Sequence, residues 1–140
     1  MKTRLAINGV CGRMGQRIVQ LALEDKDIVV AAAMEAPEHP DLGRDVGEVI
    51  GASLQGVMLR SELPLSVSVG VLIDFSTPAG TMMVLKTCTE RRIPIIIATT
   101  GHGAEQREQI EAAAHETAVL FAPNMSLAVN LLMKLVRVTG

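Results

Sequence analysis

The feature that most constrains the fold of this chain is a turn with three glycines, Gly9, Gly12 and Gly15. Residues 3–8 before it read as a buried strand, and residues 13–24 after it have the apolar spacing of a helix. Glycines at a turn between a strand and a helix let a phosphate approach bare backbone and the amides of the helix N-terminus. The spacing differs from the commoner G-x-G-x-x-G, so it is the strand–helix context that indicates a dinucleotide-binding turn.

Two charged residues near this turn support the same interpretation. Glu35 follows a second predicted strand, residues 28–34, and lies about 20 residues after Gly15, where dinucleotide folds place the carboxylate for the adenosine ribose. Arg13 lies in the first helical turn, where a cation opposes the helix dipole unless an anion is bound. The same residues could have roles without a bound dinucleotide. The glycines could only allow tight packing of the turn, and Glu35 and Arg13 could be solvated side chains.

The composition fits one ordinary α/β domain. The chain has 140 residues, 13 basic and 15 acidic, with a net charge of −2, so we expect neither nucleic acid nor a membrane as a partner. Cys11 and Cys88 have no metal or redox spacing, and no histidine or aspartate is predicted beside Cys11, so we expect no metal site and a structural Cys11. No secretion signal is evident, which favours a cytoplasmic location.

Strands and helices are predicted to alternate along the whole chain. Strands are expected at 3–8, 28–34, 57–59, 69–75, 94–99 and 118–122, with helices at 13–24, 45–49, 77–91, 103–116 and 126–138. Such alternation predicts an α/β fold, a doubly wound and mostly parallel sheet of the Rossmann type, with right-handed crossovers. We expect residues 1–140 to form one dinucleotide-binding domain.

Polar residues and glycines follow the predicted strands. They are Asn8-Gly9, Glu35, Ser76-Thr77, Thr99-Thr100-Gly101 and Pro123-Asn124. The carboxyl ends of parallel strands meet at the edge where open α/β sheets bind ligands, so these residues predict one site. Helix capping by Thr77 and Asn124 and local backbone contacts by the threonines remain alternatives. His102 is expected at the surface, and His39 and His115 are assigned no role.

Three motifs together resemble one family. Residues 9–15, 98–102 and 121–126 are similar to the N-terminal domain of dihydrodipicolinate reductase, also called 4-hydroxy-tetrahydrodipicolinate reductase, and 42–48 and 73–78 resemble its intervening segments. The resemblance implies an enzyme that uses NADH or NADPH to reduce a cyclic dicarboxylate intermediate of diaminopimelate and lysine biosynthesis.

The resemblance also implies roles for individual residues. Gly9, Val10, Cys11, Gly12, Arg13 and Met14 would hold the pyrophosphate and Glu35 the adenosine ribose, while Phe75, Ala98, Thr99, Thr100, Ala122, Pro123, Asn124 and Met125 would also contact the cofactor, mainly on its nicotinamide side. Ala98 replaces a more usual glycine. Ala36 stands where members that use NADPH well often have a basic residue, which favours NADH.

The family's catalytic features are not found in this sequence. The family has an adjacent histidine pair, a nearby lysine and a Ser-Gly-Thr segment that grips substrate carboxylates, whereas the three histidines here are scattered. We therefore expect no catalytic residues in residues 1–140, and a helix at 126–140 that leads toward a C-terminal substrate domain. The chain alone is expected to be inactive, and the full-length enzyme to be a homo-oligomer. Alternatives are a stand-alone dinucleotide sensor and another two-domain reductase, such as an aspartate-type dehydrogenase.

Overall fold

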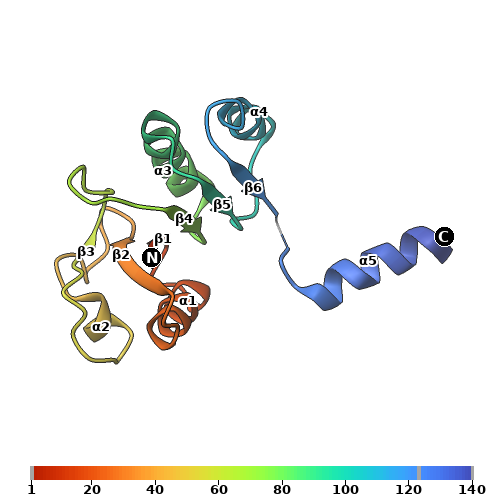
Figure 1. The fold of residues 1–140 in the computed structure, drawn as a ribbon. Helices are drawn as coiled ribbons and strands as arrows, with labels where there is room; N and C mark the ends of the chain where they lie inside the picture. The colour runs from red at the N-terminus through yellow and green to blue at the C-terminus, as the bar shows by residue number, and fades with distance from the viewer. Residues whose placement is uncertain (1, 123, 140) are drawn as a thin grey trace.

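The computed structural model describes residues 2–122 and 124–139. Strands and helices alternate along this part of the chain (Figure 1). They are β1 (Thr3–Asn8), α1 (Arg13–Glu24), β2 (Ile28–Met34), α2 (Val46–Val49), β3 (Leu59–Arg60), β4 (Val71–Asp74), α3 (Pro78–Arg91), β5 (Ile95–Ile97), α4 (Ala104–Ala113), β6 (Val119–Phe121) and α5 (Leu127–Thr139).

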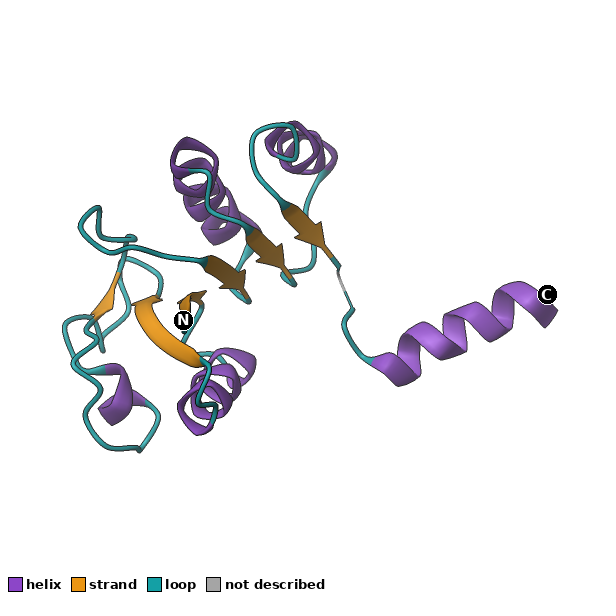
Figure 2. Ribbon diagram, in the orientation of Figure 1, coloured by secondary structure: helices purple, strands orange, loops and turns teal. Residues whose placement is uncertain are grey.

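The described strands form one sheet in the order β3-β2-β1-β4-β5-β6, and each neighbouring pair is parallel (Figure 2). The chain starts in the middle of the sheet, builds outward to β3, and then crosses back so that β4 pairs with the other side of β1. This order confirms the predicted doubly wound α/β fold. Its switch point lies between β1 and β4, where folds of this kind bind ligands.

Helices cover both faces of the sheet, with α1 and α2 on one face and α3 and α4 on the other (Figure 1). The alternation of side chains along β1 explains the two layers. Leu5 and Ile7 enter the core beneath α1, which also contains Val19. Ala6, between them, enters the core beneath α3, which also contains Leu85. The central strand therefore supplies apolar residues to two separate cores.

The first three predicted elements have the same bounds in the structure, whereas the later strands are shorter than predicted. The segment predicted as a strand at 69–75 pairs only over Val71–Asp74, and the strand predicted at 57–59 is found at Leu59–Arg60. The apolar spacing of residues 13–24 also predicts a shared face of Met14, Ile18, Leu21 and Ala22, and this prediction is partly wrong. Met14 and Leu21 are 51% and 45% exposed, because the helix packs through its smaller residues Gly15, Val19 and Ala22.

The last helix, α5, extends away from the sheet (Figure 1). Its apolar side chains are largely exposed, including Leu127 at 84% and Leu132 at 59%. Within the described residues, no helix combines the length and the hydropathy needed to cross a bilayer.

Candidate functional site

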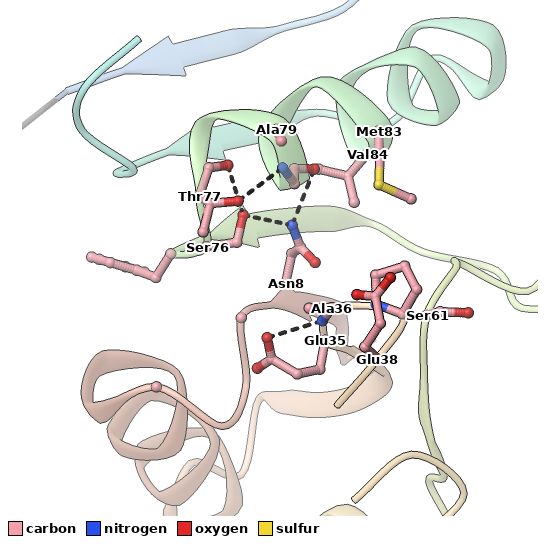
Figure 3. Close-up of a pocket in the computed structure, with 15 residues that line it drawn as sticks. Asn8, Glu35, Ala36, Glu38, Ser61, Ser76, Thr77, Ala79, Met83 and Val84 are labelled. Carbon is pink, nitrogen blue, oxygen red and sulfur yellow. Dashed lines mark hydrogen bonds between the residues drawn. The ribbon is translucent and has the colours of Figure 1, made fainter. Parts of the chain in front are cut away.

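A cavity of about 430 Å³ opens at the carboxyl ends of the strands, at the switch point of the sheet. Glu35 lies on one side and Ser76 and Thr77 on the other, with Asn8 between them (Figure 3). The lining residues are Asn8, Gly9, Gly12, Glu35, Ala36, Pro37, Glu38, Ser61, Phe75, Ser76, Thr77, Ala79, Gly80, Met83 and Val84. The loops after β1, β2, β3 and β4 therefore share one concave site.

Glycine is needed at the three positions of the first loop for different structural reasons. Gly9 has a φ of 81°, and a Cβ there would lie 2.4 Å from the carbonyl oxygen of Phe75. A Cβ on Gly15 would lie 2.1 Å from the carbonyl oxygen of Gly9, so this glycine lets α1 start directly against the loop. At Gly12 the nearest atom is 3.4 Å away, and the residue lines the cavity. Packing therefore requires Gly9 and Gly15, while Gly12 leaves space for a ligand.

The amides of this loop are mostly used within the protein. The N–H groups of Gly9 and Val10 donate to the carbonyl oxygen of Met34, at 2.9 and 3.2 Å. The amide of Gly12 donates to the carbonyl oxygen of Gly9 at 3.3 Å. The first turn of α1, which begins at Arg13, has amides that no helical carbonyl can pair, and it carries no acidic side chain. An anion at the glycine loop would therefore meet the amides at the start of α1.

Glu35 holds the glycine loop from the end of β2. Its Oε2 accepts a hydrogen bond from the amide of Cys11 at 2.9 Å, and its Oε1 accepts one from the amide of Ala36 at 3.0 Å. The residue is half-buried and lines the cavity. Because a carboxylate has about four lone-pair positions, Glu35 can accept further hydrogen bonds from a ligand while it keeps these two.

A buried carboxylate, Asp74, organises the other side of the cavity. Its Oδ1 accepts hydrogen bonds from Asn8 Nδ2 at 2.8 Å and Ser76 Oγ at 2.6 Å. Its Oδ2 accepts from Thr81 Oγ1 at 2.6 Å and Thr99 Oγ1 at 2.8 Å. Asp74 is 0% exposed, so these four donors replace the water that a carboxylate needs. The network fixes the carboxyl ends of β1, β4 and β5 relative to the start of α3.

The structure brings some of the predicted site residues together and separates others. Gly9, Gly12, Glu35 and Phe75 line the cavity. Val10, Ala98 and Thr99 are buried behind it, Cys11 and Ala122 are half-buried, and Arg13, Met14, Thr100, Asn124 and Met125 are exposed. Pro123 lies outside the described residues. Thr99 contacts Asp74 and the amide of Ser76, so it supports the cavity from behind.

His102 is buried, which corrects its expected surface position. It is 4% exposed, and its ring meets the ring of Phe121 edge to face with centroids 5.4 Å apart. Within the described part of the chain, neither ring nitrogen has a hydrogen-bond partner. The packing against Phe121 on β6 is a long-range contact that the local sequence does not indicate.

The surroundings of Cys11 also differ from the expectation. His39 Nδ1 lies 3.7 Å from its Sγ, and Asp41 lies beside His39. Burial and then the nearby carboxylate of Glu35 raise the pKa of the Cys11 thiol from 9.0 to about 12. The thiol is therefore protonated at neutral pH, so Cys11 is not a nucleophile in this environment.

Several residues of the site do not appear among the sequence candidates. Asp74 is the most informative, and its signal was visible as a single acidic residue at the end of an otherwise apolar strand, since buried acids need several donors. Ser61 lines the cavity from the loop after β3, and Met83 and Val84 line it from α3. These three have no motif, because only the tertiary fold brings them to the cavity.

The family model described as dihydrodipicolinate reductase, N-terminus, matches residues 3–125. The 4-hydroxy-tetrahydrodipicolinate reductase of Methylococcus capsulatus is 43% identical over 100% of this chain and 52% of its own length. The enzyme of the same name from Nitrosomonas eutropha is 40% identical over 97% of this chain and 51% of its own length. The chain thus spans about half the length of these curated relatives.

A solved structure gives the same result at the level of the fold. Dipicolinate-bound dihydrodipicolinate reductase from Paenisporosarcina sp. TG-14 superposes with a TM-score of 0.69 at 25% sequence identity. The match covers 96% of this chain and 52% of that one. These findings confirm the resemblance seen in the glycine loop and in the later motifs.

Proposed function

We propose that this chain, which belongs to the dihydrodipicolinate reductase family and matches its N-terminal part, binds a reduced nicotinamide dinucleotide in the cavity at the switch point. The observation that carries this proposal is the position of Gly12 in the cavity wall. The fold has room for a side chain at Gly12, but that side chain would occupy the space of the ligand. A cofactor held by backbone needs such a position. NADH or NADPH, when bound, supplies the hydride.

The pyrophosphate end of the dinucleotide would lie at the glycine loop. The amides at the start of α1 donate to its oxygens, and the positive end of the helix dipole attracts its charge. Arg13, exposed at the same helix end, adds a mobile cation. Glu35 accepts hydrogen bonds from the adenosine ribose hydroxyls with the carboxylate positions that the loop amides leave free.

The nicotinamide end would lie toward β4, β5 and β6. Phe75 lines this side of the cavity, and the buried Thr99 holds the Ser76 amide in place. The remaining residues assigned to this end by the family resemblance are Ala98, Thr100, Ala122, Pro123, Asn124 and Met125. Their role is to orient the ring and shield it from water.

For the whole protein, we propose reduction of a cyclic dicarboxylate of diaminopimelate and lysine biosynthesis, by a homo-oligomer in the cytoplasm, where nicotinamide dinucleotides are regenerated. Residues 1–140 would form its dinucleotide-binding domain, and α5 would lead toward a substrate domain. Hydride transfer needs the acceptor carbon and a proton donor held close to the nicotinamide. We propose that the second domain supplies both.

The test compares two glycines that begin helices in the same conformation. Gly12 and Gly103 are the N-caps of α1 and α4, each with a φ of −71°, but only Gly12 of the two is at the cavity. We expect Gly12→Val to abolish NADH binding measured by calorimetry, while Gly103→Val leaves the affinity unchanged. Circular dichroism checks that both variants are folded. NADH binding by folded Gly12→Val would remove the loop from the site.

A second measurement separates binding from turnover. We expect the 140-residue chain to bind NADH and to show no reductase activity with the enzymatically generated dicarboxylate substrate, followed by dinucleotide absorbance. Turnover by the purified chain would place the chemistry within these residues, with the buried His102 as the first candidate.

A further inference from the structure

We propose that Cys11, His39 and Asp41 form a three-ligand site for a thiophilic divalent cation of the Zn²⁺ class, next to the cavity but separate from it. One ligand atom from each residue lies within 4.8 Å of the others. Cys11 Sγ is 3.7 Å from His39 Nδ1, and His39 Nδ1 is 4.0 Å from Asp41 Oδ2. Ligand atoms around tetrahedral Zn²⁺, at bonds of about 2.0–2.3 Å, lie about 3.3–3.6 Å apart, so small side-chain rotations complete the site.

The ligand types select the class of cation. A thiolate favours soft or borderline metals, and an imidazole suits Zn²⁺. Zn²⁺ also accepts a single carboxylate as a ligand. A hard cation such as Mg²⁺ would need oxygen ligands where the cysteine and the histidine stand. Three protein ligands leave a fourth position for water. The side chains of His39 and Asp41 are 27% and 31% exposed, so solvent and a cation can reach the cluster.

The hydrogen bonds around His39 set the protonation state that a metal at Nδ1 requires. The amide of Asp41 donates to His39 Nδ1 at 3.2 Å, so in this contact the Nδ1 lone pair is an acceptor and the proton lies on Nε2. Coordination replaces this contact and brings His39 Nδ1 and Cys11 Sγ onto the same cation. A guanidinium N–H of Arg44 donates to Asp41 Oδ1, which leaves Oδ2 on the side of His39. Such outer partners orient metal ligands.

The backbone at Cys11 and at His39 is held by hydrogen bonds without a metal. The amide of Cys11 donates to Glu35, and the carbonyl oxygen of Cys11 accepts from Gln16 Nε2 at 3.0 Å. The amide of His39 donates to the carbonyl oxygen of Ala36 at 3.0 Å. Because the ligands are already held near their final places, a cation can bind with little ordering of the chain.

Binding of the cation has a simple proton balance. The divalent cation displaces the thiol proton of Cys11, a metal–sulfur bond forms, and one proton passes to the solvent. Nothing is oxidised or reduced. The bound cation then links the loop after β1 to the loop after β2, both of which also border the cavity. It should therefore raise the thermal unfolding temperature of the chain.

The test uses Co²⁺, which has visible and near-ultraviolet absorption and occupies Zn²⁺ sites. We expect one Co²⁺ per chain and a sulfur-to-cobalt charge-transfer band in the dinucleotide-free protein. Cys11→Ser should abolish the band, and His39→Ala should weaken Co²⁺ affinity at least about tenfold, since loss of mere outer-shell partners already costs that much. Zn²⁺ should compete for the site, and it should raise the unfolding temperature of the wild type but not that of Cys11→Ser.

Matched controls are available in the same chain. Cys88 is buried in the core beneath α3 and His115 is exposed after α4, so Cys88→Ala and His115→Ala should leave the band and the Co²⁺ affinity unchanged. Circular dichroism verifies the fold of each variant. The proposal is overturned if the wild type shows no charge-transfer band, if the band survives Cys11→Ser, or if His39→Ala binds Co²⁺ as tightly as the wild type. The measurement contains no dinucleotide, so its outcome is independent of the proposed function.

Discussion

Thr99 Oγ1 donates a hydrogen bond to Asp74 Oδ2 at 2.8 Å and accepts one from the amide of Ser76 at 2.9 Å. One hydroxyl thus connects the end of β5 to both the last residue of β4 and the loop that follows it. Ser76 lines the cavity, whereas Asp74 and Thr99 are buried behind it. The shape of the cavity wall therefore depends on side chains that a ligand would not touch.

Asp74→Asn should disturb this wall. The amide group of asparagine has only one acceptor oxygen, so its NH₂ group would meet two of the four donors that now point at the carboxylate. We expect a loss of about 1–3 kcal/mol in the free energy of unfolding, measured by urea denaturation, and weaker NADH binding. Thr89→Ala is the control, because Thr89 Oγ1 donates only to a carbonyl of its own helix, that of Leu85. Equal stability of Asp74→Asn and the wild type would contradict this account of the network.

The choice between NADH and NADPH should depend on Glu35. Its carboxylate would repel the extra phosphate of NADPH, and Ala36 offers no compensating cation. This repulsion should weaken the binding free energy of NADPH relative to NADH by about 1–3 kcal/mol, and Arg13 should partly offset it. We expect NADH to bind at least as tightly as NADPH, and Arg13→Ala to weaken NADPH more than NADH. Arg17→Ala, which removes another exposed arginine of α1, is the control. Calorimetric titrations with both cofactors measure the difference, and a clear preference of the wild type for NADPH would reject this role of Glu35.

The contribution of Asp45 to the stability of the chain should depend on pH. Hydrogen bonds from the backbone amides of Gln55, Gly47 and Gly56 hold the pKa of Asp45 below its ordinary value of 3.8. The pKa of Asp45 is lower in the folded state than in the unfolded state. Ionised Asp45 therefore contributes fully to the free energy of unfolding when the pH is above its unfolded-state pKa. This contribution is lost as the pH falls through its folded-state pKa. We expect Asp45→Asn to be less stable than the wild type at pH 7, and the difference to shrink below about pH 4. Urea denaturation as a function of pH measures this, and a difference that does not vary with pH would refute it.

The exposed apolar face of α5 should make this chain associate with itself. Leu132 and Val136 are 59% and 60% exposed and lie one helical turn apart. Replacing both with lysine should reduce association in light scattering at high protein concentration and leave the unfolding temperature unchanged. By contrast, Leu72→Ala in the core should lower the free energy of unfolding by about 2–5 kcal/mol. A strong loss of stability in the lysine variant would mean that α5 packs against the sheet in solution.

Much of the fold was predictable because local signals agreed with the tertiary structure. β1, α1 and β2 have the predicted bounds, since the glycine turn separates β1 from α1 and charged residues flank β2 on both sides. Thr77 caps α3 as predicted, accepting a hydrogen bond from the amide of Gly80. The short strands were less accurate, because the length of a strand depends on how far its neighbour continues, which the local sequence does not contain.

The site was predictable where a residue type is required by backbone chemistry and less so where side chains meet across the fold. Gly9, Gly12 and Glu35, which the glycine motif and its spacing single out, line the cavity. The contact between Cys11 and His39 joins residues 28 positions apart, and the burial of His102 depends on Phe121 from a later strand. Such pairings follow from the order of strands in the sheet, so a local motif does not reveal them.

The place of β1 between β2 and β4 also has a consequence for the order of folding. β1 and β2 are connected by a single helix, so their pairing closes a short loop at a small entropic cost. The contact between Asn8 and Asp74 spans 66 positions, so β1 meets β4 only after a much longer loop closes. We expect this meeting to limit the rate of refolding. The cavity contains residues from both halves of the chain and therefore forms late, after the β1–α1–β2 unit on which the glycine loop is built.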